Sequence, residues 1–145
     1  MSRQARLNLA EIRDAVIAAV DAAVYVGTSY DRDYLDQFVR EAPAVWIRAQ
    51  RAIPLGNDTG ATGRPLQRYS AEVLVTVVHG RYDPGTFNAS ANVDAIVEDV
   101  VDGLIFETLT GADTPLTLAG TTDGAQDDSF ITVDLLFRTE IVYHG

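Results

Sequence analysis

The stretch Phe130-Ile-Thr-Val-Asp-Leu-Leu-Phe-Arg-Thr-Glu-Ile-Val-Tyr143 decides which fold is expected of this chain. Its apolar residues recur at every second position, and β-branched and aromatic side chains dominate, which is typical of a β-strand with one buried face. The expected buried side carries Ile131, Val133, Leu135, Phe137, Ile141 and Tyr143, and only Thr139 interrupts it. The opposite side carries Thr132, Asp134, Arg138 and Glu140. At about 3.3 Å per residue this strand spans roughly 45 Å, so we expect it to extend beyond its own domain's core.

A second long strand is expected over residues 68–79. Apolar residues from Tyr69 to Val77 alternate there with Ser70, Glu72 and Thr76. Shorter strands are expected over residues 44–48 and 115–119. We predict that Val75, Val133 and Leu135 are core residues of one sheet.

Three segments show helical periodicity. Asn8 has the position of an N-cap before an apolar stripe that begins at Leu9, and Gly27 marks the expected end of this helix. A second helix is expected over residues 29–40, before Pro43. A third is expected to follow an N-cap at Asn92 and to end by Gly111, with Asp94, Glu98, Asp99 and Asp102 facing water. Gly103 lies inside it at a cost of about 1 kcal/mol relative to alanine, which indicates close packing against another backbone.

Residues 54–67 are rich in glycine and polar side chains, and we expect a long, flexible loop there. A phosphate-binding loop of the Walker type is excluded, because Gly63 is followed by Arg64-Pro65 and then by a strand. Residues 1–7, which include Arg3 and Arg6, are expected to form a flexible basic tail.

The expected order is helix, helix, strand, strand, helix, strand, strand. This order predicts an α+β fold in which helices cover one face of a mostly antiparallel four-stranded sheet, as a two-layer sandwich. The length of 145 residues and the absence of a dividing linker indicate one domain over residues 1–145.

The composition restricts the classes of function. The chain has 21 acidic and 11 basic residues, a formal charge of −10, and every base is an arginine. Such a surface repels nucleic-acid phosphates and anionic lipid headgroups, so neither specific DNA binding nor membrane binding is expected. The sequence lacks both the apolar core of a signal peptide and an apolar run of about 18 residues, so we expect the protein to stay inside the cell.

No pattern of catalytic or metal-binding residues is found. The absence of cysteine removes thiolate chemistry and most structural zinc sites. His79 and His144 lie at expected strand ends without a third ligand at suitable spacing, and the serines lack a Gly-x-Ser-x-Gly elbow. We therefore predict neither an enzyme nor a cofactor.

Four segments together resemble the tail terminator proteins of long-tailed bacteriophages, the group similar to minor tail protein U and its relatives in Mu-like prophages. They are Ala-Pro-Ala-Val-Trp-Ile at residues 42–47, Arg-Tyr-Ser-Ala-Glu-Val-Leu-Val-Thr-Val-Val-His at 68–79, the helical segment at 92–103 and the final strand at 130–144. The resemblance covers nearly the whole chain, as a pattern of elements rather than a diagnostic motif.

The resemblance implies a homo-hexameric ring that caps the tail tube, ends its polymerisation and forms the joining surface to the head-side connector. Its partners are then the tail tube protein, the head–tail connector protein and copies of itself, with DNA only passing through the lumen. The expected location is the virion tail, assembled in the cytoplasm of the bacterial host. Two other classes stay open: another phage neck or tail adaptor, including a tail completion protein, and a small cytoplasmic enzyme or ligand-binding domain.

Candidate contact residues follow from these expectations. A long amphipathic strand can extend across a subunit boundary, and arginines suit pairing with carboxylates of a neighbour. Trp46 is either a core residue or an interface anchor, because Arg48 and Gln50 on its face are polar. The predicted subunit interface contains Trp46, Arg48, Arg68, Asp134, Arg138 and Glu140. The predicted docking loop for the tube or neck contains Gly56, Asn57, Asp58 and Arg64.

Overall fold

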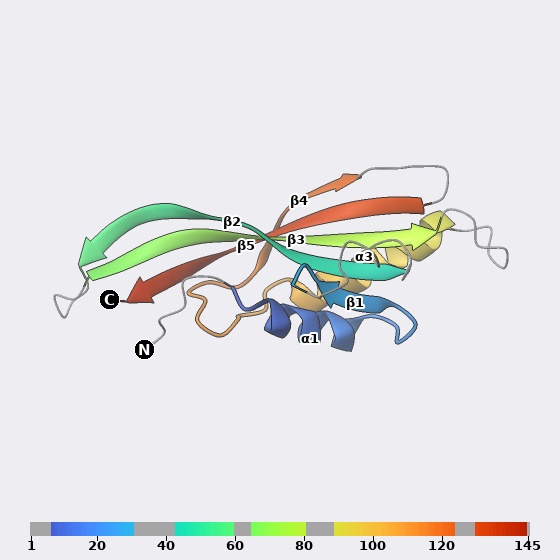
Figure 1. The fold of residues 1–145 in the computed structure, drawn as a ribbon, viewed down its shortest axis with the longest axis horizontal. Coiled ribbons are helices and arrows are strands. Elements are labelled where there is room, and N and C mark those ends of the chain that lie inside the picture. The colour runs from blue at the N-terminus through green and yellow to red at the C-terminus, as the bar shows by residue number, and fades with distance from the viewer. Residues whose placement is uncertain (1–6, 31–42, 60–64, 81–88, 124–129, 145) are drawn as a thin grey trace.

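Five strands and two helices make up the computed structural model, which describes residues 7–30, 43–59, 65–80, 89–123 and 130–144 (Figure 1). In chain order the elements are α1 (Leu9–Ala19), β1 (Tyr25–Thr28), β2 (Ala44–Thr59), β3 (Pro65–Gly80), α3 (Ala89–Leu104), β4 (Thr117–Asp123) and β5 (Phe130–His144). The strands form one sheet in the order β1-β2-β3-β5-β4. The predicted α+β class is therefore correct, but the sheet has five strands and not four.

The additional strand is β1, which pairs parallel with β2, whereas all other neighbours are antiparallel. We expected a helix to continue to Gly27, but α1 ends at Ala19, and Val20 already has extended backbone. Four residues are too few for a period of two to be recognised, so only pairing with β2 shows that this segment is a strand. The helix expected over residues 29–40 falls almost wholly outside the described residues.

The central ladder agrees with the alternation in the sequence. Strands β3 and β5 pair without a register shift from Leu66↔His144 to Gly80↔Phe130, and Val75 lies opposite Leu135. Val75 and Leu135 are fully buried, and Val133 is partly buried against the same cluster, which confirms the predicted core.

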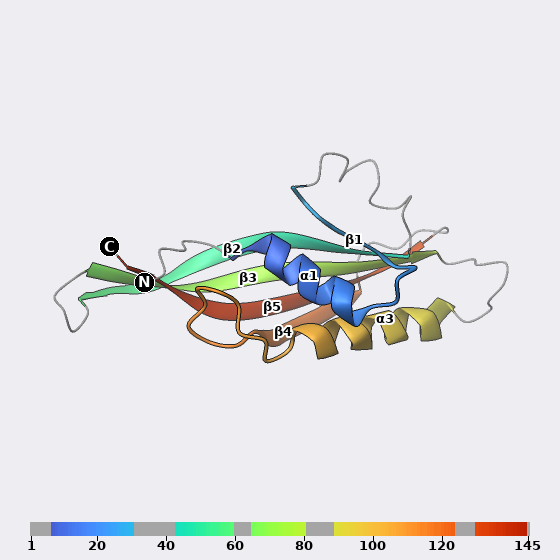
Figure 2. The same ribbon diagram turned by 90° about the horizontal axis from the view of Figure 1, so that it is seen from below.

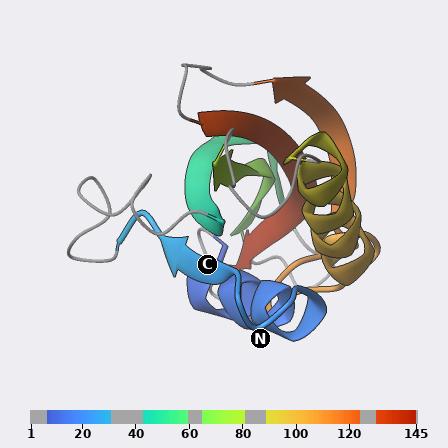
Figure 3. The ribbon, with the colours of Figure 1, turned by 90° about the vertical axis from the view of Figure 1, so that its right-hand side faces the viewer.

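Both helices pack on one face of the sheet, as predicted, because their apolar stripes meet the same cluster. Asn8 caps α1 by accepting hydrogen bonds from the backbone of Ala10 and Glu11. Viewed along the strands, the sheet curves around the helices (Figure 3). The core between them combines residues of α1, α3, β2, β3 and β5, including Ile12, Val16, Ile47, Val73, Val100, Leu104 and Phe137. Leu7, which we expected in the flexible tail, is also buried in this core; residues 1–6 lie outside the described part.

The predicted loop over residues 54–67 is wrong at both ends. Strand β2 continues to Thr59 and β3 begins at Pro65, so residues 54–59 and 65–67 belong to a long hairpin ladder. Pro54 is tolerated because β2 pairs with β1 only as far as Ile47, and beyond that its outer edge needs no backbone N–H. The ladder has bulges between Ala49 and Arg51 and between Pro54 and Gly56, and Gly56 has a φ of 145°. The remaining predicted loop residues, 60–64, lie outside the described residues.

The helices are too short to cover the sheet. At about 1.5 Å per residue α1 and α3 reach roughly 16 and 24 Å, whereas strands of 15 or 16 residues reach roughly 50 Å. Figure 2 shows the tips of β2, β3 and β5 extending past both helices. We call this projection the arm and define it as residues 53–59, 65–70 and 140–144. The strand expected to extend beyond its core does so.

The two helices touch at Gly103. A Cβ atom at this position would lie 2.5 Å from the Cβ of Ala19 and 3.5 Å from the carbonyl oxygen of Ala15. Helix α1 therefore occupies the space that any larger side chain needs. The close packing predicted from a glycine inside a helix is confirmed.

The variant Gly103→Ala is expected to lose up to about 2 kcal/mol of stability. Alanine is favoured in a helix by about 1 kcal/mol, but forcing a methyl group into a packed contact costs about 1–3 kcal/mol, and a Cβ cannot rotate away. Chemical denaturation measures the change. The double variant Ala19→Gly/Gly103→Ala removes the clash and is expected to recover part of the loss. A Gly103→Ala chain more stable than the wild type would contradict this packing.

Candidate assembly surface

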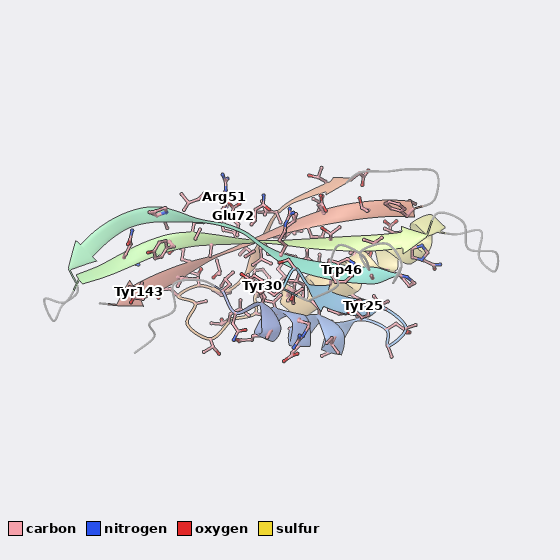
Figure 4. All side chains as sticks on the ribbon, in the orientation of Figure 1. Tyr25, Tyr30, Trp46, Arg51, Glu72 and Tyr143 are labelled. Atoms are coloured by element: carbon pink, nitrogen blue, oxygen red, sulfur yellow. The ribbon has the colours of Figure 1, made fainter. Side chains whose placement is uncertain are left out.

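The sheet face opposite the helices carries a row of three charged side chains on adjacent strands. Arg51 of β2 lies opposite Glu72 of β3, and Glu72 lies opposite Arg138 of β5. The Glu72 carboxylate accepts a hydrogen bond from Nε of Arg51 and another from Nη2 of Arg138 at 3.2 Å. The Glu72 side chain is 1% exposed, whereas those of Arg51 and Arg138 are 63% and 47% exposed. The two guanidinium groups thus cover the acid and leave a net positive charge in this row. Figure 4 shows Arg51 and Glu72 side by side on the sheet.

A β-bulge places Arg51 in this row. Arg48 pairs with Leu74, so an unshifted ladder would bring Gln50 opposite Glu72. The bulge between Ala49 and Arg51 inserts one residue and brings the arginine there instead. A neutral amide would leave the buried carboxylate with one fewer cation, so the bulge determines the electrostatics of the row.

The arginines lower the pKa of Glu72 below its usual value of 4.5. The largest cause is the hydrogen bond from Arg51; burial acts in the opposite direction, and the hydrogen bond from Arg138 and the charges of both arginines lower the pKa further. The carboxylate therefore stays ionised although it is buried, because both arginines donate to it.

The next row along the sheet is Arg48, Leu74 and Leu136. The Arg48 side chain is exposed, and its Nη2 lies 3.3 Å from Oε1 of Gln50. Leu74 and Leu136 are half-buried beside it. We call these two rows together (Arg48, Arg51, Glu72, Leu74, Leu136 and Arg138) the arginine face.

Exposed apolar side chains gather near the base of the arm. A pocket of about 380 Å³ is lined by Leu55, Phe106, Pro115 and parts of β3, β4 and β5. Phe106 follows the end of α3, is 71% exposed and has a φ of 63°. This conformation costs a non-glycine residue of the order of 1 kcal/mol, and the hydrogen bond from the Phe106 N–H to the Leu116 oxygen, 2.8 Å long, helps to hold it. The exposure of its ring and its strained backbone make Phe106 a candidate contact residue.

Two of the predicted interface residues, Arg48 and Arg138, lie on the arginine face, and the other four do not. Trp46 is buried in a second, smaller cluster with Ala44 and Val78, its ring centroid 5.3 Å from that of Tyr25, so of its two expected roles the structure favours a buried packing residue. Asp134 lies toward the opposite end of β5 from the arm, where it accepts a hydrogen bond of 2.7 Å from Oγ1 of Thr76.

The remaining two lie on the arm. Arg68 is half-exposed, and its Nη1 is 3.6 Å from Oδ2 of Asp113. Glu140 is partly buried and lines the pocket, and its backbone N–H donates to Oγ1 of Thr114 at 2.9 Å. The six predicted residues therefore spread over the length of the sheet and do not form one cluster.

Three of the four predicted docking residues lie at the far end of the arm. Gly56, Asn57 and Asp58 belong to β2, where they pair with Arg68, Gln67 and Leu66. Arg64 lies outside the described residues. These positions therefore belong to a paired strand and not to a loop, and their role in docking stays a prediction.

The two histidines are far apart, because His144 pairs near the start of β3 whereas His79 lies near its end. The Nδ1 atom of His79 is 2.7 Å from the oxygen of Gly80. Within the described residues no three metal-ligating side chains converge, and no helix is long and apolar enough to cross a membrane.

Sequence reasoning did not select Arg51, Glu72 or Phe106 as parts of a candidate surface, and Glu72 is itself buried beneath the two arginines. A single acid among valines in β3 was a signal for Glu72, since an acid on a central strand needs a partner. Neither the bulge that brings Arg51 opposite it nor the exposure of Phe106 has a signature in the sequence.

Comparison with known proteins supports the fold. No family model and no curated protein matches the chain. A chain of the virion of a native gene transfer agent particle matches in structure with a TM-score of 0.52 and 17% sequence identity, over 90% of this chain and 84% of that chain. The two chains therefore share a fold.

Proposed function

We propose that this chain is a structural protein of a phage-like virion, in which a ring of copies caps the tail tube. The ring ends tube polymerisation and forms the joining surface to the head-side connector. The observation that carries this proposal is the arm, a three-stranded projection that extends past the helices and has exposed apolar side chains at its base. The shared fold with a chain of a gene transfer agent virion supports a structural role in a phage-like particle.

The arm is suited to contact between proteins. Beyond Ile47 no described strand pairs with the outer side of β2, and such an edge offers backbone groups to an adjacent chain. Leu55 and Phe106 next to it offer apolar area of the kind that anchors interfaces. The net charge of −10 suits a lumen through which DNA slides, because phosphates are repelled.

The test adds the purified protein to polymerising tail tube subunits of the same virion. Shorter tubes with a ring at one end in negative-stain images are the expected result. Tubes of unchanged length without density at either tip would end the proposal. A ring on tubes of unchanged length would instead favour another neck or tail adaptor.

A variant pair makes this test specific to the arm. Ile53→Asp/Leu55→Asp charges the exposed apolar side chains of β2, and we expect at least a tenfold higher concentration to be needed for capping, because burying a charge at a contact is costly. The single variant Leu55→Asp is compared with Ile17→Asp as its matched control, because Ile17 of α1 is 52% exposed and Leu55 is 51% exposed. Equal loss of capping in both variants would remove the arm from the contact.

A further inference from the structure

The arginines are unevenly distributed over the surface. Five arginines have described side chains, and four of them, Arg48, Arg51, Arg68 and Arg138, point to the sheet face opposite the helices; the fifth, Arg13, is on α1. The arginine face contains three of these four and a single acid, Glu72, so its formal charge is +2 (three arginines minus one glutamate). A positive surface of this kind is unusual on a chain whose net charge is −10.

Two further acids, Asp134 and Glu140, limit the positive area at its two borders. Both lie on β5 and are partly buried. Asp134 accepts a hydrogen bond from Thr76, and Glu140 lines the pocket beside Phe106. Arg51 and Arg138 donate to Glu72 but are 63% and 47% exposed, and Arg48 is exposed beside Gln50, so part of each guanidinium group can be reached by another molecule. Leu74 and Leu136 lie half-buried beside them.

The opposite charge lies on α3, on the other side of the sheet. Its buried stripe of Val93, Ile96, Val100 and Leu104 packs on the core, and its exposed side carries four acids and no base: Asp94, Glu98, Asp99 and Asp102. Asp94, Glu98 and Asp102 follow one another at i,i+4, where like charges repel and weaken a helix. This side of α3 therefore gains if a cationic surface is brought against it.

We infer that the arginine face of one copy binds the acidic side of α3 of a second copy. The two surfaces match in charge, and because they lie on opposite sides of the sheet a chain cannot join its own. Because the contact joins two different surfaces, each copy can bind one neighbour through its arginine face and another through α3. A chain of such contacts closes into a ring if the rotation between neighbours is suitable. This inference shares with the proposed function only the requirement that copies of the chain associate.

The contact has a defined dependence on salt. Exposed ion pairs are individually weak and are screened by ions, so the association depends on several pairs together and on the apolar area of Leu74 and Leu136. We expect the apparent dissociation constant to rise by the order of tenfold when the ionic strength is raised from about 0.05 to 0.5 M.

Two charge reversals test the pairing by sedimentation at low salt. Arg48→Glu changes the arginine face without touching the Glu72 hydrogen bonds, and Glu98→Arg changes the centre of the acidic stripe. Each variant alone is expected to associate about tenfold more weakly or worse, because like charges then face each other. A mixture of the two variants, and a chain that carries both, are expected to recover association, since every contact again joins opposite charges.

Matched controls separate this contact from a general effect of net charge. Arg13→Glu and Glu107→Arg make the same charge changes at residues that belong to neither surface, and are expected to leave association unchanged. The chain with both reversals keeps the net charge of the wild type. The inference is overturned if the controls weaken association equally, if neither combination recovers it, or if the wild type is monomeric at its highest soluble concentration. Those results leave the tube-capping assay unaffected, so this inference can fail while the proposed function stands.

Discussion

Replacing Leu135 with aspartate is expected to leave the chain unfolded at neutral pH. Leu135 is fully buried in the centre of β5, opposite Val75 on one side and Thr121 on the other. Removing a buried leucine side chain costs about 2–5 kcal/mol, and burying an unpaired carboxylate adds several more. The sum approaches or exceeds the about 5–15 kcal/mol by which a domain is normally stable. Circular dichroism and thermal unfolding of the purified variant measure the result.

Thr121→Asp is the control for this variant. Thr121 is the cross-strand neighbour of Leu135 on β4, but its side chain is exposed, so the same carboxylate stays in water. We expect its free energy of unfolding to change by no more than about 0.5 kcal/mol. A soluble Leu135→Asp variant that melts cooperatively would show that the core face of β5 is misassigned.

The second large effect is expected from Arg51→Ala/Arg138→Ala. This double variant leaves the Glu72 carboxylate buried without either of its cationic partners. Removing the partner of a buried ion typically costs about 3–5 kcal/mol. We expect the lower end of that range, because truncating two side chains that cover the acid also admits water. The single variants are expected to lose less, since one arginine stays bound.

The contribution of Glu72 to stability changes with pH in opposite directions in the wild type and in the double variant Arg51→Ala/Arg138→Ala. In the wild type the folded-state pKa of Glu72 lies below the unfolded value of 4.5, so its contribution to stability is present above pH 4.5 and is lost as the pH falls through the lower folded value. In the double variant burial acts without the arginines and raises the pKa. Protonation then favours the folded state, and the destabilisation decreases as the pH falls from 7 toward 4.

Urea denaturation between pH 3 and 7 measures this reversal. Glu72→Gln serves as the reference, because the difference from it isolates the titration of Glu72 from that of the other carboxylates. Arg48→Ala is the control for loss of an arginine from the same face, since Arg48 does not contact Glu72. If the double variant shows the same pH dependence as the wild type, the arginines do not hold Glu72 in its ionised form.

The elements that are amphipathic over many residues could be predicted from the sequence alone. Apolar residues at every second position predict β3, β5 and the core that these strands share, and helical spacing predicts the buried stripe of α3. This works because the face on which a side chain lies follows from the period of the backbone. The roles of Asn8 and Gly103 could also be predicted from the sequence. An N-cap bonds to backbone N–H groups a few residues along the chain, and a glycine inside a helix indicates that a side chain there would lack space.

Tertiary structure alone decided the features in which segments distant in the chain meet. Strand β1 is stable only through parallel pairing with β2, and β2 continues through Pro54 at an edge where no described strand pairs with it. The row of Arg51, Glu72 and Arg138 depends on a bulge that shifts the register by one residue. A shift of one residue reverses the face of every following side chain, and periodicity within one strand carries no information about its partner's register. The charged surface proposed to join the subunits is therefore a product of strand pairing.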